Sequence, residues 1–215
     1  MAPAAIVFDW DNTLADGWLA IQAGLNAAFR HFALPEWSME QVLANTRKSM
    51  RESFPALFGE RWEEARELFM AAVRAEHLAV LRPLPGTAAM LGVAATVAPL
   101  GVVSNKQGPL LRAEVAHLGW GGFFRQTLGA GDAVRDKPDP TAIFTVLEAC
   151  GVRPSPEAWY VGDTALDMQA ARNAGLTAVL LGDAAHDGGV GACNPDMHFA
   201  DAKTLAEYLG SAEIR

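Results

Sequence analysis

The stretch that decides the fold stands at the start of the chain, where residues 4–13 read AAIVFDWDNT. Its apolar run has the length and composition of a buried strand, and the run ends on Asp9 and Asp11. Side chains two apart on an extended chain point to the same side, so the two carboxylates are expected to lie together. Like charges held this close are costly unless a cation or a reaction uses them. The pattern indicates a catalytic or metal site at the carboxyl end of a strand, where α/β folds bind their ligands.

Two simpler interpretations compete with a catalytic pair. An Asp-x-Asp sequence after a strand can merely cap a turn or the following helix. An EF-hand calcium loop would need Gly at its sixth position and Glu at its twelfth. Those positions hold Leu14 and Ala20, and a strand rather than a helix precedes the loop, which excludes the EF hand. The choice between a cap and an active site depends on whether distant strands end in matching chemistry.

Three later segments supply that chemistry. They are residues 100–106 (LGVVSNK), which end an apolar run on Ser104, residues 136–140 (DKPDP), which carry Lys137 before a helical pattern, and residues 158–167 (AWYVGDTALD), which contain Asp163 and Asp167. Each segment alone has an ordinary explanation, as a turn, a solvated lysine or acidic groups beside a helix dipole. Their occurrence together, in this order, predicts a single site assembled at one edge of a sheet.

In these motifs the chain resembles the phosphatases of the haloacid dehalogenase superfamily, specifically the phosphoglycolate-phosphatase-like group with a helical (C1) cap. The family pattern is Asp-x-Asp-x-Thr, then Ser or Thr, then Lys, then Gly-Asp with a further Asp. It is matched by Asp9, Asp11, Thr13, Ser104, Lys137, Asp163 and Asp167. Asn12 stands where the family more often has Gly, and Gly17 where it often has Ser. Because Asn tolerates a left-handed backbone better than most residues, the tight turn after Asp11 can be kept.

The resemblance implies a hydrolase of phosphomonoesters with four catalytic residues. Asp9 would attack phosphorus and form an aspartyl-phosphate. Asp11 would protonate the leaving alcohol and then deprotonate the water that hydrolyses the intermediate. Ser104 would bind phosphate oxygens, and Lys137 would neutralise the nucleophile and the charge that develops in the transition state.

Magnesium is the cofactor that the resemblance implies. It would be bound by the carboxylates of Asp9 and Asp163 and by the main-chain carbonyl of Asp11, with Asp167 holding the waters of the metal. An all-oxygen ligand set with retained water suits the hardness of magnesium.

Substrate contacts are expected from two places. Beside the catalytic motifs, Thr13 and Asn105 are assigned to the substrate. Farther along the chain, the adjacent Arg47 and Lys48 would suit a leaving group with its own carboxylate, such as glycolate, although basic residues on a helix are usually only solvated. The expected partner is a small phosphorylated metabolite, with phosphoglycolate as the leading candidate.

Helical and strand patterns divide the chain into a core and an insert. Residues 16–82 are helical in pattern, with apolar spacing from Trp18 to Phe32, a capping box at Ser38 and a third helix from Glu60. Beyond them, helices alternate with strands expected at 97–103, 124–128, 159–161, 178–181 and 197–199. Such alternation predicts a parallel sheet with helices on both faces. The expected fold is a Rossmann-like three-layer α/β/α core of residues 1–15 and 83–215, with an all-α helical cap at 16–82.

Composition narrows the function classes. The chain is 51% hydrophobic and 20% charged, which is typical of a globular protein. A formal net charge of −8, with no basic run longer than two residues, argues against nucleic acid as a partner. The absence of a membrane span, of a signal peptide and of a disulfide framework around Cys150 and Cys193 predicts a cytoplasmic protein without membrane partners. The five histidines form no metal pair and are each expected to be isolated. The pattern does not choose between a monomer and a homodimer.

Other activities remain as alternatives to a phosphatase. A phosphomutase of the same superfamily, similar to β-phosphoglucomutase, would return the phosphoryl group to a sugar. The dehalogenase and phosphonatase branches lack a carboxylate at the second position, where this chain has Asp11. A receiver-like phosphoacceptor domain also uses Asp, Ser or Thr, and Lys. The N-terminal position of Asp9, the helical insert and the presence of Asp11 favour the enzyme over such a signalling domain.

Overall fold

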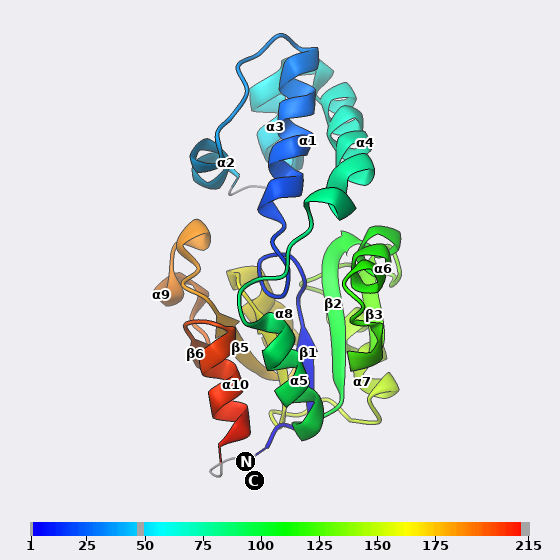
Figure 1. Ribbon diagram of the computed structural model, residues 1–215, viewed down its shortest axis with the longest axis vertical. Coiled ribbons are helices and arrows are strands. Elements are labelled where there is room, and N and C mark those ends of the chain that lie inside the picture. The colour runs from blue at the N-terminus through cyan, green and yellow to red at the C-terminus, as the bar shows by residue number, and fades with distance from the viewer. Residues whose placement is uncertain (1, 47–49, 212–215) are drawn as a thin grey trace. The chain divides into compact units, whose positions relative to one another are not determined.

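The computed structural model describes residues 2–46 and 50–211, without the side chains of residues 50–52 (Figure 1). The chain divides into two compact units, Met1–Ala15 with Pro83–Arg215, and Asp16–Arg82. The first unit carries the sheet and every motif that ends a strand. The second unit is an insert between β1 and the rest of the sheet, and its described residues form helices.

Six parallel strands make up the sheet of the first unit. They are β1 (Ala5–Phe8), β2 (Leu100–Gln107), β3 (Phe124–Ala130), β4 (Ala158–Gly162), β5 (Thr177–Leu181) and β6 (Met197–Phe199). Their order across the sheet is β3-β2-β1-β4-β5-β6. The order reverses between β1 and β4, and in a doubly wound sheet this is the position at which ligands bind.

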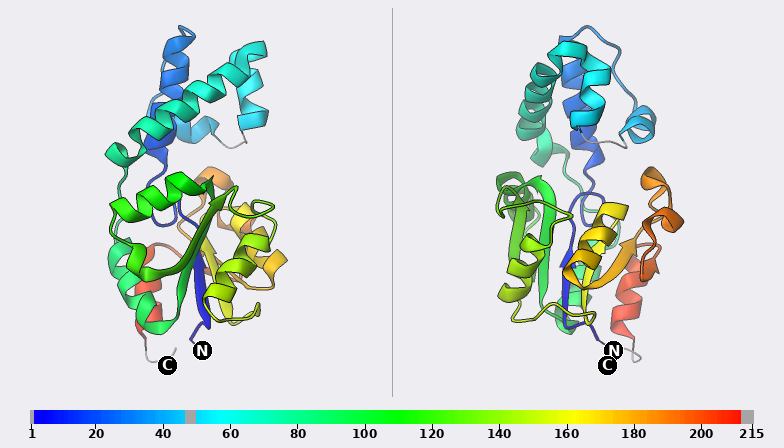
Figure 2. Two further views of the ribbon diagram at one scale, coloured as in Figure 1. Left: turned by 90° about the vertical axis from the view of Figure 1, so that its right-hand side faces the viewer. Right: turned by 180° about the vertical axis from the view of Figure 1, so that it is seen from behind.

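Helices cover both faces of this sheet (Figure 2). They are α5 (Thr87–Val97), α6 (Gly108–His117), α7 (Thr141–Ala149), α8 (Ala165–Ala174), α9 (Val190–Cys193) and α10 (Ala202–Gly210), with short 3₁₀ turns at Gly121–Phe123 and Ala185–Asp187. The apolar faces of α7 and α8 join Val7, Val103 and Tyr160 in one core on one side of the sheet. Helices α5 and α10 pack together on the other side (Figure 1). The predicted three-layer Rossmann-like core is confirmed.

Burial explains why β1 forms where it does. All four of its residues are fully buried, because the strand is central and covered on both faces, as its continuous apolar run predicted. The expected strand at 97–103 is partly wrong in its bounds. Val97 ends α5, and β2 starts at Leu100 and continues through Gln107. Its pairing with β3 is irregular between Val103 and Gln107, where four steps along β2 match two along β3.

The described residues of the insert form four helices and a 3₁₀ turn. They are α1 (Trp18–His31), α2 (Met39–Asn45), α3 (Met50–Phe58), the turn Gly59–Arg61 and α4 (Trp62–Val80). The predicted capping box at the start of α2 is present, since the Ser38 hydroxyl accepts from the backbone of Gln41 and the Gln41 side chain accepts in return. Pro55 lies inside helix α3, within the range that the sequence predicted to be helical.

Aromatic side chains supply the core of the insert. The rings of Phe29 and Phe58 stack with centroids 5.4 Å apart, and Phe54 meets Phe69 edge-on at 5.7 Å. At Gly24 a Cβ would lie 2.7 Å from the Phe69 ring, so glycine is what allows α1 and α4 to pack this closely. The helical spacing of these aromatics is therefore explained by packing, as the sequence predicted.

The chain enters and leaves the insert at adjacent points. The backbone N–H of Asp16 donates to the carbonyl of Arg82 at 2.8 Å, and the N–H of Leu84 donates to the carbonyl of Leu14 at 3.1 Å. Ala15 and Pro83 form an isolated antiparallel bridge between these two bonds. The two connecting segments thus run side by side.

Among the described residues, no helix combines the length and the apolar composition that crossing a membrane requires.

Candidate active site

The site begins at the point where β1 and β4 end. Phe8 pairs with Val161 in the sheet, and the backbone N–H of the next residue, Asp9, donates to the carbonyl of Val161 at 2.8 Å. Asp163 follows Gly162, the last residue of β4, and Asp167 lies in the first turn of α8. Parallel pairing therefore brings carboxylates that are far apart in the sequence to the same edge of the sheet.

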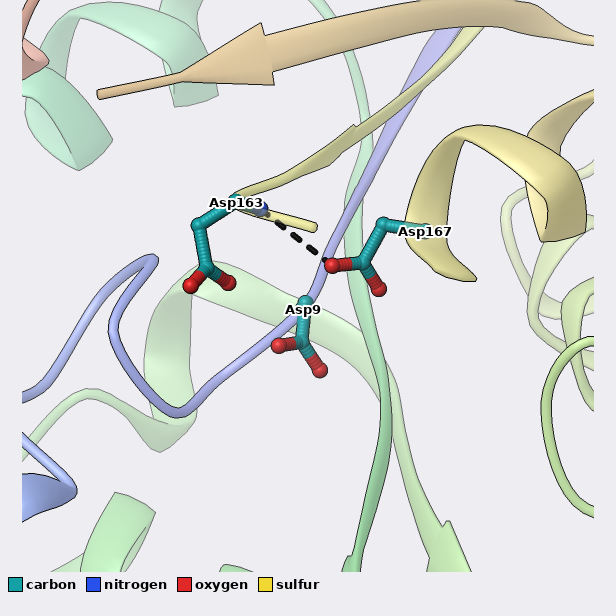
Figure 3. Close-up of side chains that lie close together, drawn as sticks. All are labelled: Asp9, Asp163 and Asp167. Carbon is teal, nitrogen blue, oxygen red and sulfur yellow. Dashed lines mark hydrogen bonds between the residues drawn. The ribbon is translucent and has the colours of Figure 1, made fainter. Parts of the chain in front are cut away.

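Asp9, Asp163 and Asp167 form a buried acidic cluster in which one oxygen from each lies within 4.8 Å of the others (Figure 3). Like charges buried this close are unfavourable without a cation between them. Oδ2 of Asp163 is buried, with Nε2 of His186 at 3.2 Å as a close but poorly aligned neighbour. A carboxylate oxygen without a well-formed hydrogen bond, beside two further carboxylates, fits a hard divalent cation such as magnesium, which prefers oxygen ligands.

Lys137 partly compensates this cluster. Its ammonium group donates to Oδ1 of Asp9 at 2.6 Å and to Oδ1 of Asp167 at 2.7 Å, and only 3% of the side chain is exposed. Burial alone would lower the pKa of Lys137, but the carboxylates of Asp167 and Asp9 outweigh it and hold the pKa well above the ordinary range. The lysine therefore stays charged. Its burial contradicts the view of a solvated surface lysine.

Burial and the neighbouring negative charges raise the pKa values of two acids in the cluster. Burial raises the pKa of Asp9 from 3.8 to about 7, with Lys137 opposing this and the carboxylates of Asp167 and Asp163 adding to it. Burial likewise raises the pKa of Asp163, while the nearby His186 opposes the effect. In the absence of a cation, the cluster thus favours the protonated form of at least one acid, and a bound cation would remove that preference.

Hydrogen bonds fix Asp167 more firmly than the other two acids. Its Oδ2 accepts from the hydroxyl of Thr164 at 2.6 Å and from the backbone N–H groups of Thr164 and Asp163 at 3.1 and 3.2 Å. The bond from the Thr164 N–H is one half of the capping box at the start of α8, and in the other half the N–H of Asp167 donates to the Thr164 hydroxyl. At Gly162 a Cβ would lie 2.4 Å from the Cβ of Asp167, which explains the Gly-Asp sequence at the end of β4.

Thr13 and Asn105, which are predicted to contact substrate, each hold another residue of the site. The Thr13 hydroxyl is buried and donates to Oδ1 of Asp163 at 2.9 Å. The Asn105 side chain donates to the carbonyl of Lys137 at 3.1 Å and accepts from the N–H of the same residue at 3.0 Å. Thr13 therefore orients a candidate metal ligand, and Asn105 places the backbone of the lysine.

Ser104 lies in β2 at the irregular part of its pairing with β3. Its side chain is buried, and its hydroxyl accepts from the backbone N–H of Lys106 at 3.2 Å. Irregular pairing of this kind re-aims side chains and is common beside active sites. The hydroxyl proton of Ser104 is still available for a phosphate oxygen.

Asp11 lies outside the acidic cluster. Its side chain is 30% exposed, and Oδ1 accepts from the ammonium group of Lys106 at 2.7 Å. The turn that follows contains Asn12 with a φ of 61°, so the expected left-handed backbone at this position is confirmed. The N–H groups of Thr13, Leu14 and Ala15 all point at the carbonyl of Trp10, which makes the turn tight.

Sequence reasoning missed two residues near the site. The first is Glu114 in α6, which is buried and contacts Lys106. A sequence signal for its burial was present, because Glu114 lies between Leu111 and Val115 on the apolar face of the helix. His186 is the second, with Nε2 lying 3.2 Å from Oδ2 of Asp163. The expectation that every histidine is isolated is wrong for His186 and also for His31, whose Nε2 lies 3.0 Å from Oε1 of Glu64 in the insert. No local pattern pointed to the His186 contact.

Arg47 and Lys48, the expected contacts for the leaving group, lie outside the described residues.

Comparison with known proteins agrees with this geometry. A family model for haloacid dehalogenase-like hydrolases matches residues 6–181. A phosphoglycolate phosphatase of Pectobacterium atrosepticum is 32% identical over 197 residues, which cover 81% of this chain and 78% of the relative. A phosphoglycolate phosphatase of Photorhabdus laumondii is 26% identical and covers 98% of this chain and 94% of its own. A haloacid dehalogenase-like hydrolase from Streptococcus pneumoniae has the same fold, with a TM-score of 0.83 at 20% identity over 96% of this chain and 98% of that one.

The family model spans the sheet from β1 to β5 and includes the strand ends that carry the acidic cluster. The chain is therefore a hydrolase of the haloacid dehalogenase-like family, similar to its phosphoglycolate phosphatases.

Proposed function

We propose that this protein is a magnesium-dependent phosphatase that hydrolyses a small phosphomonoester through an aspartyl-phosphate on Asp9. One observation carries the proposal: Asp9 ends the central strand with Oδ1 held by Lys137, beside two further buried carboxylates that can bind a cation. Within the described residues, Oδ2 of Asp9 accepts no hydrogen bond, which leaves it available as a nucleophile. A carboxylate fixed in this way is a suitable nucleophile toward phosphorus.

In the first half of the reaction, an Asp9 oxygen attacks phosphorus, and the bond from phosphorus to the leaving oxygen breaks. Asp11 donates a proton to that oxygen, so the product leaves as an alcohol. The side chain of Asp11 is 30% exposed and free of the acidic cluster, which suits a group that must reach the substrate. Lys137 and the Ser104 hydroxyl stabilise the charge on the phosphoryl oxygens.

In the second half, water attacks the phosphorus of the aspartyl-phosphate. Asp11, now ionised, takes a proton from that water as general base, and the bond from phosphorus to Asp9 breaks. Inorganic phosphate is released, and both acids return to their starting states. The same residue therefore serves as acid and then as base, so its placement affects both steps.

Asp9 and Asp163 are the residues that would hold magnesium by their carboxylates, with the main-chain carbonyl of Asp11 as a further ligand. Asp167 would hold the waters of the metal, since its own oxygens already accept hydrogen bonds from Lys137, Thr164 and Asp163. When bound, the ion neutralises the phosphate and draws charge from the phosphoryl oxygens. Calcium accepts more ligands at longer distances and is expected to replace magnesium poorly.

The substrate class follows from the relatives and from the insert. Relatives across most of this chain are named phosphoglycolate phosphatase, which makes phosphoglycolate the leading candidate. We propose that the helical insert, residues 16–82, acts as a cap that selects the leaving alcohol, because the core residues contact only groups common to all phosphomonoesters. Excluding water over the site would also protect the aspartyl-phosphate.

The direct test is phosphate release from a panel of phosphorylated metabolites, with magnesium, with calcium and after exhaustive chelation. Turnover of a small monoester that depends on magnesium is the expected result. Full activity after chelation would exclude the proposed mechanism. Transfer of the phosphoryl group to a sugar instead of water would identify a mutase, and the absence of turnover would indicate a phosphoacceptor domain.

The role of Arg47 and Lys48 needs a comparison of two substrates. If this pair binds a carboxylate on the leaving group, Arg47→Ala and Lys48→Ala should lower kcat/KM for phosphoglycolate by on the order of tenfold while sparing a neutral alkyl phosphate. An equal loss on both substrates, or no loss, would assign specificity to other residues of the insert.

A further inference from the structure

A buried lysine other than Lys137 lies between two carboxylates near the site. The ammonium group of Lys106 donates to Oδ1 of Asp11 at 2.7 Å and to Oε2 of Glu114 at 2.8 Å. The side chains of Lys106 and Glu114 are 9% and 1% exposed. Burial would lower the pKa of Lys106, but Asp11 and Glu114 outweigh it and raise the pKa, so the lysine is charged.

Glu114 is a rigid anchor for this lysine. Its Oε2 also accepts from Nε1 of Trp10 at 2.6 Å, and Trp10 is fully buried with its ring edge-on to Trp120, 5.8 Å away. Trp10 is the residue between Asp9 and Asp11. Glu114 therefore connects α6 both to the main chain that carries the two catalytic acids and to the lysine that holds one of them.

Stability alone is a poor explanation for this network. Buried ion pairs cost desolvation energy that their attraction often fails to repay, and apolar residues of similar size commonly stabilise a core as well or better. What an ion pair provides is a fixed geometry. In this chain the geometry is applied to Asp11, whose side chain is 30% exposed.

We propose that Lys106, anchored by Glu114, is a positioning residue that aims the Asp11 carboxylate at the leaving oxygen of the substrate. The inference rests on the proposed function, since it requires Asp11 to be the general acid. Lys106 occupies Oδ1, and within the described residues Oδ2 of Asp11 accepts no hydrogen bond and remains available to the substrate. Glu114 gives Lys106 a second carboxylate partner, which holds the ammonium group from the side of α6.

Leaving groups of different basicity separate positioning from other roles. Phenyl phosphate and 4-nitrophenyl phosphate have similar shapes, but the phenolate of the first is more basic and depends far more on a proton from Asp11. The ratio kcat/KM covers the steps up to the first irreversible one, which is phosphorylation of Asp9. General acid catalysis contributes about 10²–10⁴-fold where it is needed.

The variant to measure is Lys106→Met, which keeps the length of the side chain and removes the charge. Its kcat/KM should fall by about 10²-fold with phenyl phosphate and by less than about fivefold with 4-nitrophenyl phosphate. Glu114→Gln keeps an acceptor for Trp10 but removes the anchoring charge, and it should show the same selectivity with a smaller loss. Lys203→Met is the matched control, since the Lys203 side chain is 78% exposed and lies in α10.

An equal loss on both substrates in Lys106→Met and Glu114→Gln would overturn the proposal and make Lys106 a phosphate contact or a purely structural residue. Absence of turnover by the unaltered protein would instead refute the proposed function. In that case a double-mutant cycle of Asp11→Asn with Lys106→Met, measured by chemical denaturation, tests the contact itself. Additive changes in the free energy of unfolding would overturn the positioning role, and coupling between the two changes would support the contact between Lys106 and Asp11 without its catalytic use.

Discussion

Two lysines each bridge two carboxylates in this protein, and their surroundings differ. Lys137 joins Asp9 to Asp167, and both acids belong to the buried cluster at the end of β1 and β4. Lys106 joins Asp11 to Glu114, which is buried in α6 and also accepts from Trp10. Under the proposed function, the first lysine adds charge at the reacting centre, and the second connects the general acid to the scaffold.

This difference separates two ways of assisting the same reaction. A charge at the reacting centre affects every substrate, because every phosphomonoester develops the same charge on its phosphoryl oxygens. A link to the scaffold affects only those substrates that need a well-placed proton. Variants of the two lysines, measured on leaving groups of different basicity, distinguish these contributions.

Asp9→Asn should have the largest effect, because no other residue can form the covalent intermediate. Turnover of 4-nitrophenyl phosphate is expected to fall below about a thousandth of the unaltered rate, while the fold is kept. Acid-quenched intact mass should show no phosphorylated protein. Asp201→Asn is the control, since Asp201 caps α10 and Asn caps about as well. Retention of a tenth of the activity by Asp9→Asn would show that the nucleophile is another residue.

Lys137→Met should lower kcat by about 10²–10³-fold, which is the usual effect of removing one preorganised charge. The loss should be the same for phenyl and 4-nitrophenyl phosphate, in contrast to Lys106→Met. Steady-state kinetics on both esters provides the measurement. A loss confined to the more basic leaving group would place Lys137 in proton transfer and remove the distinction between the two lysines.

Asp163→Asn should weaken magnesium binding by about 10²-fold and Asp167→Asn by about tenfold. Oδ2 of Asp163 is buried with no well-formed hydrogen bond, only Nε2 of His186 at 3.2 Å among the described residues, whereas both oxygens of Asp167 accept hydrogen bonds. Magnesium titrations of activity, and of the melting temperature as a second measure, give the two affinities. If Asp167→Asn were the more damaging change, the assignment of direct and water-mediated ligands would be reversed.

The smallest effect concerns stability and pH in the absence of metal. Because the pKa of Asp9 is raised from 3.8 to about 7, the folded state binds a proton more tightly than the unfolded chain across that window. The free energy of unfolding should therefore fall as the pH rises from about 4 to about 7, by on the order of a few kcal/mol. The raised pKa of His186 acts in the same direction, since its stabilising contribution is present at low pH and is lost as the pH rises.

Denaturation of the chelated protein over this pH range checks the prediction. Magnesium should restore stability most at the upper end of the range, where the cluster is ionised. Asp9→Asn should flatten the profile. A metal-free protein whose stability rises with pH would show that Lys137 compensates the cluster fully.

Much of the fold and of the cluster followed from local sequence patterns. Buried parallel strands have continuous apolar runs, and Asp9 and Asp163 directly follow such runs, so the sheet brings them together. Contacts between residues that are far apart in the sequence were harder to predict. The hydroxyl of Thr13 could equally have faced substrate, and only the three-dimensional path of the chain directs it to Asp163. The same holds for Asn105, whose amide matches the backbone of a residue 32 positions away.

Charged pairs were the least predictable feature. Nothing in the local sequence around Lys106 selects Asp11, 95 residues earlier, over other carboxylates. The position of Glu114 on an apolar helix face indicated that it is buried, but no pattern indicated that Lys106 is its partner. His186 lies in a loop of small residues after β5, where the direction of the side chain depends on the turn Ala185–Asp187 rather than on any periodic pattern.

The paired backbone segments at Ala15 and Pro83 also bear on how such a chain can diversify. Because the entry and exit of the insert are hydrogen-bonded neighbours, the number of residues between them is not constrained by the spacing of β1 and α5. Lengthening an insert whose two ends are already joined adds little to the entropy cost of closing the loop. Insertions, deletions and helix replacements within residues 16–82 can therefore accumulate while the hydrolytic residues keep their registration. If the insert selects the substrate as proposed, substrate range and bond-breaking chemistry can change independently along a single polypeptide.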